Sequence, residues 1–140
     1  MKRLTAISLA LTAFAVSSII LLCSCSHTSA NIKSAAMTTF VTEEGEPADE
    51  VRTYPAGVPE LIVFAHLYNA PKNTMVTFVW SCVSDSSELG MVRLDSGEKT
   101  NRYLFSYLTN EMGWPKGDYR VAITIGNRSK PDAVVNFKVR

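Results

Sequence analysis

Residues 74–82 read Thr-Met-Val-Thr-Phe-Val-Trp-Ser-Cys, and this stretch decides the fold. β-Branched and aromatic residues are common here, as they are in strands. Two sets of residues alternate along the stretch: Val76, Phe78, Trp80 and Cys82 on one side, and Met75, Thr77, Val79 and Ser81 on the other. The pattern predicts a strand with Trp80 on the face that is buried. We expect Trp80 to lie between two sheets, with Val121 and Phe137 among its neighbours.

Similar short runs lie on both sides of this strand. We expect strands at residues 36–42, 61–68, 91–94, 102–108, 118–125 and 133–139. Turn-forming residues such as Pro, Gly, Asn and Asp separate them, and no long run has the helical period. About seven short strands in a little over 100 residues is the scale of an immunoglobulin-like sandwich. The sequence therefore predicts an all-β, immunoglobulin-like β-sandwich of about seven antiparallel strands over residues 36–140.

Two segments resemble small bacterial immunoglobulin-like modules. Residues 67–80, Leu-Tyr-Asn-Ala-Pro-Lys-Asn-Thr-Met-Val-Thr-Phe-Val-Trp, resemble the hairpin of their second and third strands. Residues 114–121, Trp-Pro-Lys-Gly-Asp-Tyr-Arg-Val, resemble the entry into the penultimate strand. The resemblance implies that Trp80 fills the core and that Tyr119 bonds back to the backbone as a tyrosine corner. Such a likeness is structural and implies no activity.

An export signal precedes the strands. From Leu4 to Leu22 there are 19 residues without a charge, preceded by the basic residues Lys2 and Arg3. This layout is typical of a secretory signal peptide, although the run approaches the ~20 apolar residues that span a bilayer. Length alone therefore leaves an uncleaved single-pass anchor open, and a simple secreted protein is a third alternative.

Residues 22–25, Leu-Cys-Ser-Cys, resemble the lipobox of bacterial lipoproteins. Leu22 fits its first position, Ser24 the position before cleavage and Cys25 the modified residue. The resemblance implies diacylglycerol on the Cys25 thiol, cleavage before Cys25 and often a further acyl chain, which together anchor a protein stably. Ser26 stands where an aspartate would favour the inner membrane. We therefore expect a lipid anchor in the bacterial cell envelope, in the outer membrane if the host has two.

The chain is predicted to have three parts: a signal peptide at 1–24, a lipidated cysteine with a small, polar tether at 25–35, and the sandwich at 36–140. Once Cys23 is removed and Cys25 is acylated, Cys82 is the remaining free thiol, so no intramolecular disulfide can form. Cys82 lies in an apolar stretch and is expected to be a small buried side chain rather than a nucleophile.

Charge excludes an electrostatic nucleic-acid binder. The chain has 14 basic and 13 acidic residues, and removing residues 1–24 takes away only Lys2 and Arg3, which leaves 12 basic and 13 acidic residues. This balance gives no strong net field for DNA, RNA or anionic lipid. We expect no nucleic-acid partner.

Catalytic and metal-binding patterns are missing from the sequence. His27 lies in the predicted tether, and His66 is expected to be a partly exposed strand residue without partners near it in sequence. Residues 43–50 carry five carboxylates. They could bind calcium, but their spacing fits no known calcium loop, and such runs are usually solvated connections. We expect no catalytic residues, no metal and no cofactor.

Aromatic residues offer the best candidates for a binding surface. Tyr103, Phe105 and Tyr107 alternate along one predicted strand; they could form a platform for sugar or peptide, but packing into the core is the preferred interpretation. Tyr68 and Trp114 lie at strand ends, where amphipathic rings can be exposed. They are the predicted binding-surface residues.

These observations favour a non-enzymatic, lipid-tethered envelope protein that binds a protein or glycan partner or serves as an accessory subunit. The loops or edge strands of the sandwich would carry the binding. Two alternatives stay open. One is a small metal-dependent hydrolase that uses His66 with the acidic residues 43–50. The other is a protease inhibitor that presents residues 84–90 as a loop.

Overall fold

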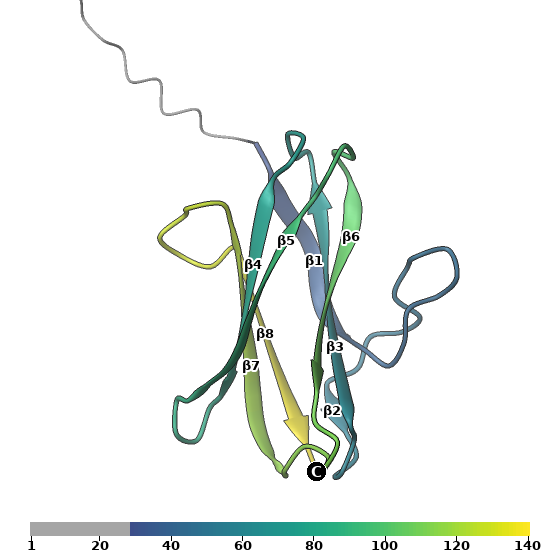
Figure 1. The fold of residues 1–140 in the computed structure, drawn as a ribbon, viewed down its shortest axis with the longest axis vertical. Coiled ribbons are helices and arrows are strands. Elements are labelled where there is room, and N and C mark those ends of the chain that lie inside the picture. The colour runs from purple at the N-terminus through teal and green to yellow at the C-terminus, as the bar shows by residue number, and fades with distance from the viewer. Residues whose placement is uncertain (1–28) are drawn as a thin grey trace, which may run out of the picture.

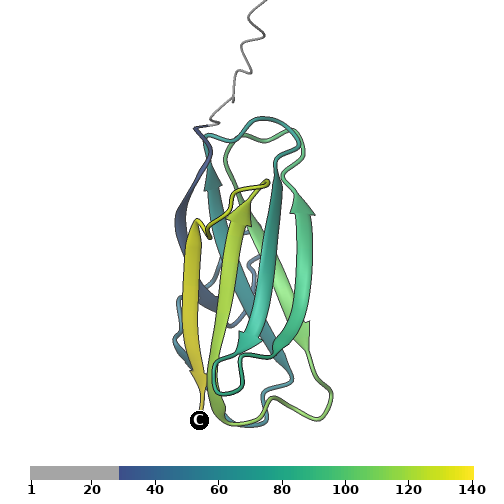
Figure 2. The same cartoon turned by 90° about the vertical axis from the view of Figure 1, so that its left-hand side faces the viewer.

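The computed structural model describes residues 29–140, which form eight strands and no helix (Figure 1). Cys25, His27 and the predicted signal peptide lie outside these residues. Within the described part of the chain, no helix is long and apolar enough to cross a membrane. Two sheets pack face to face, and Figure 2 shows the larger one in front of the smaller.

The smaller sheet has the order β1-β3-β6 and the larger one the order β2-β8-β7-β4-β5. The strands of the smaller sheet are β1 (Asn31–Thr38), β3 (Glu60–Tyr68) and β6 (Arg102–Thr109). Those of the larger sheet are β2 (Thr53–Tyr54), β4 (Met75–Cys82), β5 (Glu88–Asp95), β7 (Gly117–Ile125) and β8 (Ala133–Val139). The paired strands run antiparallel, except that the two-residue β2 runs parallel to β8.

This topology is that of an immunoglobulin-like sandwich. The chain passes from one sheet to the other between β3 and β4, between β5 and β6 and between β6 and β7, as the Greek-key connections of that fold require. The predicted fold class is therefore confirmed. The short β2 is the strand that the sequence pattern did not reveal, because two residues are too few to show an alternation.

The first strand begins earlier than the sequence predicts. Asn31 already pairs with Tyr68, five residues before the predicted domain boundary at residue 36, so residues 31–35 are strand and not tether. Ala30 is buried and Ile32 packs against the core. The small polar residues that suggested a tether alternate with these apolar ones, because β1 is an edge strand with one exposed side.

Trp80 lies between the sheets and is 1% exposed. It stands opposite Val121 in the β4–β7 register, and its ring is 6.1 Å from that of Phe137 in an edge-to-face arrangement. The indole N–H donates a hydrogen bond of 2.9 Å to Ser106 Oγ on β6. This bond crosses from one sheet to the other, so Trp80 joins the two sheets through a hydrogen bond as well as through packing.

Tyr119 closes the entry into β7. Its hydroxyl donates a 2.6 Å hydrogen bond to the carbonyl oxygen of Pro115, four residues upstream, which is the geometry of a tyrosine corner. The ring stacks on Phe137, with centroids 5.4 Å apart. Burial raises the pKa of the Tyr119 hydroxyl above its ordinary value.

Cys82 is only half-buried, so the expectation of a buried core thiol is corrected. It is the last residue of β4 and lies on the same side of the strand as Trp80, where it packs against the edge of the core. Its sulfur lies 3.1 Å from Ser84 Oγ in the following turn.

Candidate functional site

The aromatic residues of β6 lie on the outside of the sandwich. Leu104 and Ser106 are buried, and Ser106 holds the Trp80 indole, so the other side of β6 faces away from the core. Tyr103, Phe105 and Tyr107 occupy that other side. The preferred expectation that these rings pack inward is therefore wrong, because the small Ser106 makes room for Trp80 and fixes the strand's orientation.

Strand β3 adds a second row of rings to the same side. In the β3–β6 register, Phe64 lies opposite Phe105 and His66 lies opposite Tyr103. Tyr68 follows at the end of β3. We call this surface the outer aromatic face; its six residues are Phe64, His66, Tyr68, Tyr103, Phe105 and Tyr107.

The rings of the outer aromatic face pack on one another. The His66 imidazole stacks on Tyr103 with centroids 4.3 Å apart and an angle of 24°. Phe64 meets Tyr103 edge to face at 5.8 Å, and Phe105 lies 6.2 Å from Tyr103. Phe64 is buried beneath its neighbours, whereas Tyr107 is 47% exposed. The outer aromatic face therefore has a buried centre at Phe64 and an exposed rim at Tyr68 and Tyr107.

An acidic hairpin projects beside this sheet after β1 (Figure 1). We define it as residues 40–48; it is closed by a bridge between Val41 and Pro47 and by a 2.8 Å hydrogen bond from Thr42 N–H to the Glu46 carbonyl. Three exposed glutamates form its tip: Glu43, Glu44 and Glu46. Phe40, at its base, is 59% exposed.

Asp49 holds the base of the hairpin to β1. Its carboxylate accepts hydrogen bonds from the Thr39 hydroxyl (2.6 Å), the Thr39 N–H (2.8 Å) and the Thr38 hydroxyl (2.8 Å). The two bonds from Thr39 make the largest contributions to a lowered pKa of the Asp49 carboxyl. The hairpin is thus attached through an ionised side chain.

Electrostatics connects the hairpin with the outer aromatic face. Burial lowers the pKa of His66, the positive charge of Lys33 lowers it further, and the negative charge of Glu46 raises it. Figure 1 shows the hairpin beside the smaller sheet, and the outer aromatic face lies on β3 and β6 of that sheet.

The structure does not bring the two predicted binding-surface residues together. Tyr68 is 42% exposed at the end of β3, with the Lys33 ammonium group 5.3 Å from its ring centroid. Trp114 lies before β7, at the opposite end of the sandwich. It is half-buried, donates a 3.3 Å hydrogen bond to the Leu108 carbonyl and meets the Tyr119 ring at 6.3 Å.

The residues of the two alternative functions are also placed. Within residues 29–140, no group of three or more His, Cys, Asp and Glu side chains could hold a metal ion. His66 stacks on Tyr103 beside the acidic hairpin. The proposed inhibitory segment is a tight turn: Cys82 N–H bonds to the Ser87 carbonyl, and Glu88 already begins β5.

A shallow groove of about 420 Å³ lies at the open edge between β1 and β8. It is lined by alanine, valine and methionine side chains and by Glu50, Arg52 and Asn136, and its lining contains no aromatic ring. The outer aromatic face is a stronger candidate than this groove, because tyrosine and tryptophan are enriched among the residues that dominate binding energy at protein interfaces.

Comparison with known proteins gives distant structural likenesses. No family model matches the chain, and no curated protein sequence matches it. The alkylpurine DNA glycosylase AlkC of Pseudomonas fluorescens, bound to DNA containing an abasic site analog, is similar over 79% of this chain and 30% of its own, with 13% identity and a TM-score of 0.46. The chain thus spans less than a third of that glycosylase.

Two smaller structures align over the same share of the chain. The C-terminal domain of wzt has 12% identity and a TM-score of 0.47, with 73% of its length covered. A CARDB domain from Pyrococcus furiosus has 13% identity and a TM-score of 0.41, with 93% covered. None of these likenesses identifies a function for this chain.

Proposed function

We propose that this protein is a non-enzymatic, lipid-anchored binding protein of the bacterial cell envelope, and that its outer aromatic face and acidic hairpin hold a protein partner. The observation that carries the proposal is the outward orientation of Tyr103, Phe105 and Tyr107 beside exposed carboxylates. The membrane anchor rests on the resemblance of residues 22–25 to a lipobox.

The chemistry of this surface favours a partner segment rich in lysine and arginine. Phe40 and Tyr107 are large apolar side chains that are 59% and 47% exposed, and they would lose contact with water on binding. Exposed ring faces attract cationic side chains, and the hairpin glutamates add charge complementarity. A glycan partner has no positive charge for these carboxylates to attract, so a basic protein segment is the better fit.

Photo-crosslinking in cells tests this proposal. A crosslinking amino acid replaces Tyr107, and in a matched control it replaces Met91, which is 49% exposed on the outer side of the larger sheet. We expect a discrete protein adduct from position 107 and none from position 91. Reversing the hairpin charges with Glu43→Lys, Glu44→Lys and Glu46→Lys should abolish the adduct.

The outcomes separate the candidates. Equal adducts from both positions, or an adduct that persists after charge reversal, would contradict a specific basic partner. Loss of the adduct on addition of a cell-wall glycan, but not on addition of a lysine-rich peptide, would instead favour a glycan partner.

A further inference from the structure

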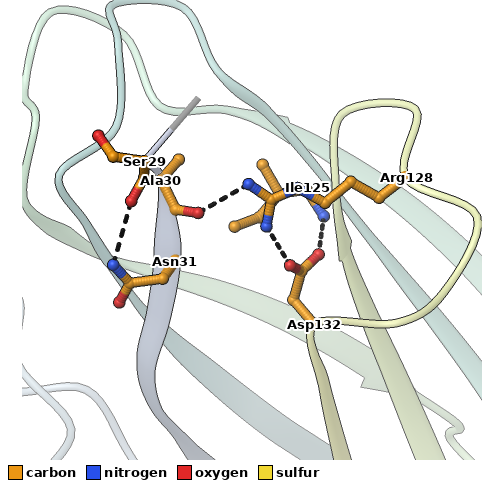
Figure 3. A network of polar contacts seen from close by, with 6 residues as sticks. All are labelled: Ser29, Ala30, Asn31, Ile125, Arg128 and Asp132. Carbon is orange, nitrogen blue, oxygen red and sulfur yellow. Dashed lines mark hydrogen bonds and ion pairs between the residues drawn. The ribbon is translucent and has the colours of Figure 1, made fainter. Parts of the chain in front are cut away.

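The chain enters the described structure at a fixed point at one end of the sandwich. Arg128, in the connection between β7 and β8, donates a 2.8 Å hydrogen bond to the Ala30 carbonyl and pairs with Asp132 (Figure 3). Asp132 in turn accepts a 2.7 Å bond from the N–H of Ile125. Ala30 itself is 3% exposed. The start of the domain is therefore held to the β7–β8 connection of the larger sheet.

Three connections meet at this end, which we call the entry end. They are residues 69–74, 96–101 and 126–132. The first two are joined by hydrogen bonds from Ala70 N–H to the Thr100 carbonyl and from Asn73 N–H to the Gly97 carbonyl. Asn69 also donates a 2.8 Å bond to Ser29 Oγ, which ties the chain's entry to the first connection.

Charge is distributed unevenly along the sandwich, although the totals nearly cancel. Residues 29–33, 68–75, 95–102 and 125–132 at the entry end contain six basic and three acidic side chains. The basic ones are Lys33, Lys72, Lys99, Arg102, Arg128 and Lys130. At the opposite end, residues 55–60, 83–88 and 110–118 together with Arg140 contain two basic and five acidic side chains.

We propose that the entry end lies against anionic phospholipid headgroups; this inference rests on the proposed lipid anchor. Cys25 precedes Ser29 by four residues, and four extended residues span at most about 14 Å. A lipid on Cys25 would therefore hold Ser29, at the entry end, within about two Debye lengths of the membrane surface. Tyr68 and Met75, 42% and 41% exposed at this end, suit the interface between headgroups and water.

The orientation can be measured by headgroup quenching. Full-length protein with Cys82→Ser carries a fluorophore at Ser129→Cys in the entry end or at Met112→Cys in the opposite end, and is reconstituted into vesicles that contain nitroxide-labelled lipid. In vesicles of phosphatidylglycerol and phosphatidylcholine, we expect quenching at position 129 to be several-fold stronger than at position 112. In pure phosphatidylcholine the difference should shrink.

Charge variants give the matched comparison. Lys72→Glu, Lys99→Glu and Lys130→Glu together should reduce quenching at position 129 to its level in neutral vesicles. Lys116→Glu, Arg120→Glu and Lys138→Glu make the same change in net charge towards the opposite end and should leave it unchanged.

Two results would overturn the inference. Equal quenching at the two labelled positions would show that the entry end does not face the membrane. If quenching at position 129 changes neither with lipid charge nor in the entry-end variant, the tether alone brings this end close to the membrane and the basic residues do not contribute. If mass analysis finds Cys25 without lipid, the proposed anchor fails separately. The unlipidated chain should then still sediment with phosphatidylglycerol vesicles at low salt, and failure to do so would reject the basic surface itself.

Discussion

Trp80 joins the two sheets through both its ring and its N–H group. Trp80→Ala removes the largest buried side chain and should lower the free energy of unfolding by ~3–5 kcal/mol. Ser106→Ala leaves the ring in place but removes the acceptor of the indole N–H, with an expected loss of ~1–3 kcal/mol.

Urea unfolding followed by fluorescence measures both losses, with Ser129→Ala as an exposed control that should change stability little. A Trp80→Ala variant with a free energy of unfolding close to that of the wild type would contradict the register of β4. A neutral Ser106→Ala would contradict the bond between the sheets.

His66 gives the protein a defined pH dependence. Burial, then Lys33, lowers its pKa in the folded state below the ordinary value of 6.5. Between the pKa of His66 in the folded chain and its value of 6.5 in the unfolded chain, the unfolded chain binds more protons. The contribution of neutral His66 to the free energy of unfolding is therefore complete above pH 6.5 and is lost as the pH falls through the folded-state pKa.

We therefore expect the free energy of unfolding to be lower at about pH 5 than at about pH 7.5, and His66→Phe to remove part of that drop. NMR titration should also place the His66 pKa below 6.5 and show that Lys33→Gln raises it. A folded-state pKa at or above 6.5 would contradict the geometry of the outer aromatic face.

Among the elements, the acidic hairpin is attached to the end of β1 by the carboxylate of Asp49. Asp49→Ala removes the acceptor of three hydrogen bonds from Thr38 and Thr39. The Ala48 N–H, which bonds to the Phe40 carbonyl at 3.1 Å, should then exchange with solvent about tenfold faster, the factor that ~1.4 kcal/mol represents.

Glu50→Ala is the matched control, since it removes a neighbouring exposed carboxylate and should leave Ala48 protected. The Asp49→Ala variant should also weaken the crosslink from position 107, because the glutamates lose their fixed position. Unchanged exchange at Ala48 would show that other contacts hold the hairpin.

The sequence predicts most of these elements, but it does not decide which side of β6 is buried. Tyr103, Phe105 and Tyr107 form one alternating set, and Leu104, Ser106 and Leu108 form the other. Both sets are largely apolar, so periodicity does not show which of them faces the core. The tendency of aromatic rings to be buried favours the more aromatic set, which is the wrong one here. Ser106 is the residue that decides, because it bonds to Trp80 from another strand, and such a partner cannot be read from local spacing.

The beginning of β1 is hidden for a related reason. Its side chains are small and polar, and the strand becomes recognisable only through pairing with β3, more than 30 residues later along the chain. By contrast, β4, β7 and β8 have strongly apolar inner faces, and their predicted ranges agree closely with the observed strands. Long-range pairing explains what the local pattern leaves out.

Across the sandwich, the proposed anchor point and the proposed binding surface lie in different parts of the fold. The entry end carries an excess of basic groups. The acidic hairpin projects from the side of the sandwich (Figure 1), and the outer aromatic face lies on β3 and β6 of the smaller sheet. A domain anchored at the entry end would keep that side open to the surrounding space. Apart from Tyr68, which belongs to both surfaces, binding to a partner and attachment to the membrane would then use different residues.

The mass of the mature N-terminus tests the central claim, that this domain is fixed to a membrane through Cys25. We expect the processed chain to begin at Cys25 with the mass of a diacylglycerol, and often of a further acyl chain, added to it. Cys25→Ala should abolish lipid labelling and leave unprocessed precursor. A mature chain that begins at an unmodified residue after Cys25, or one that keeps residues 1–22, would contradict attachment through a lipid on Cys25.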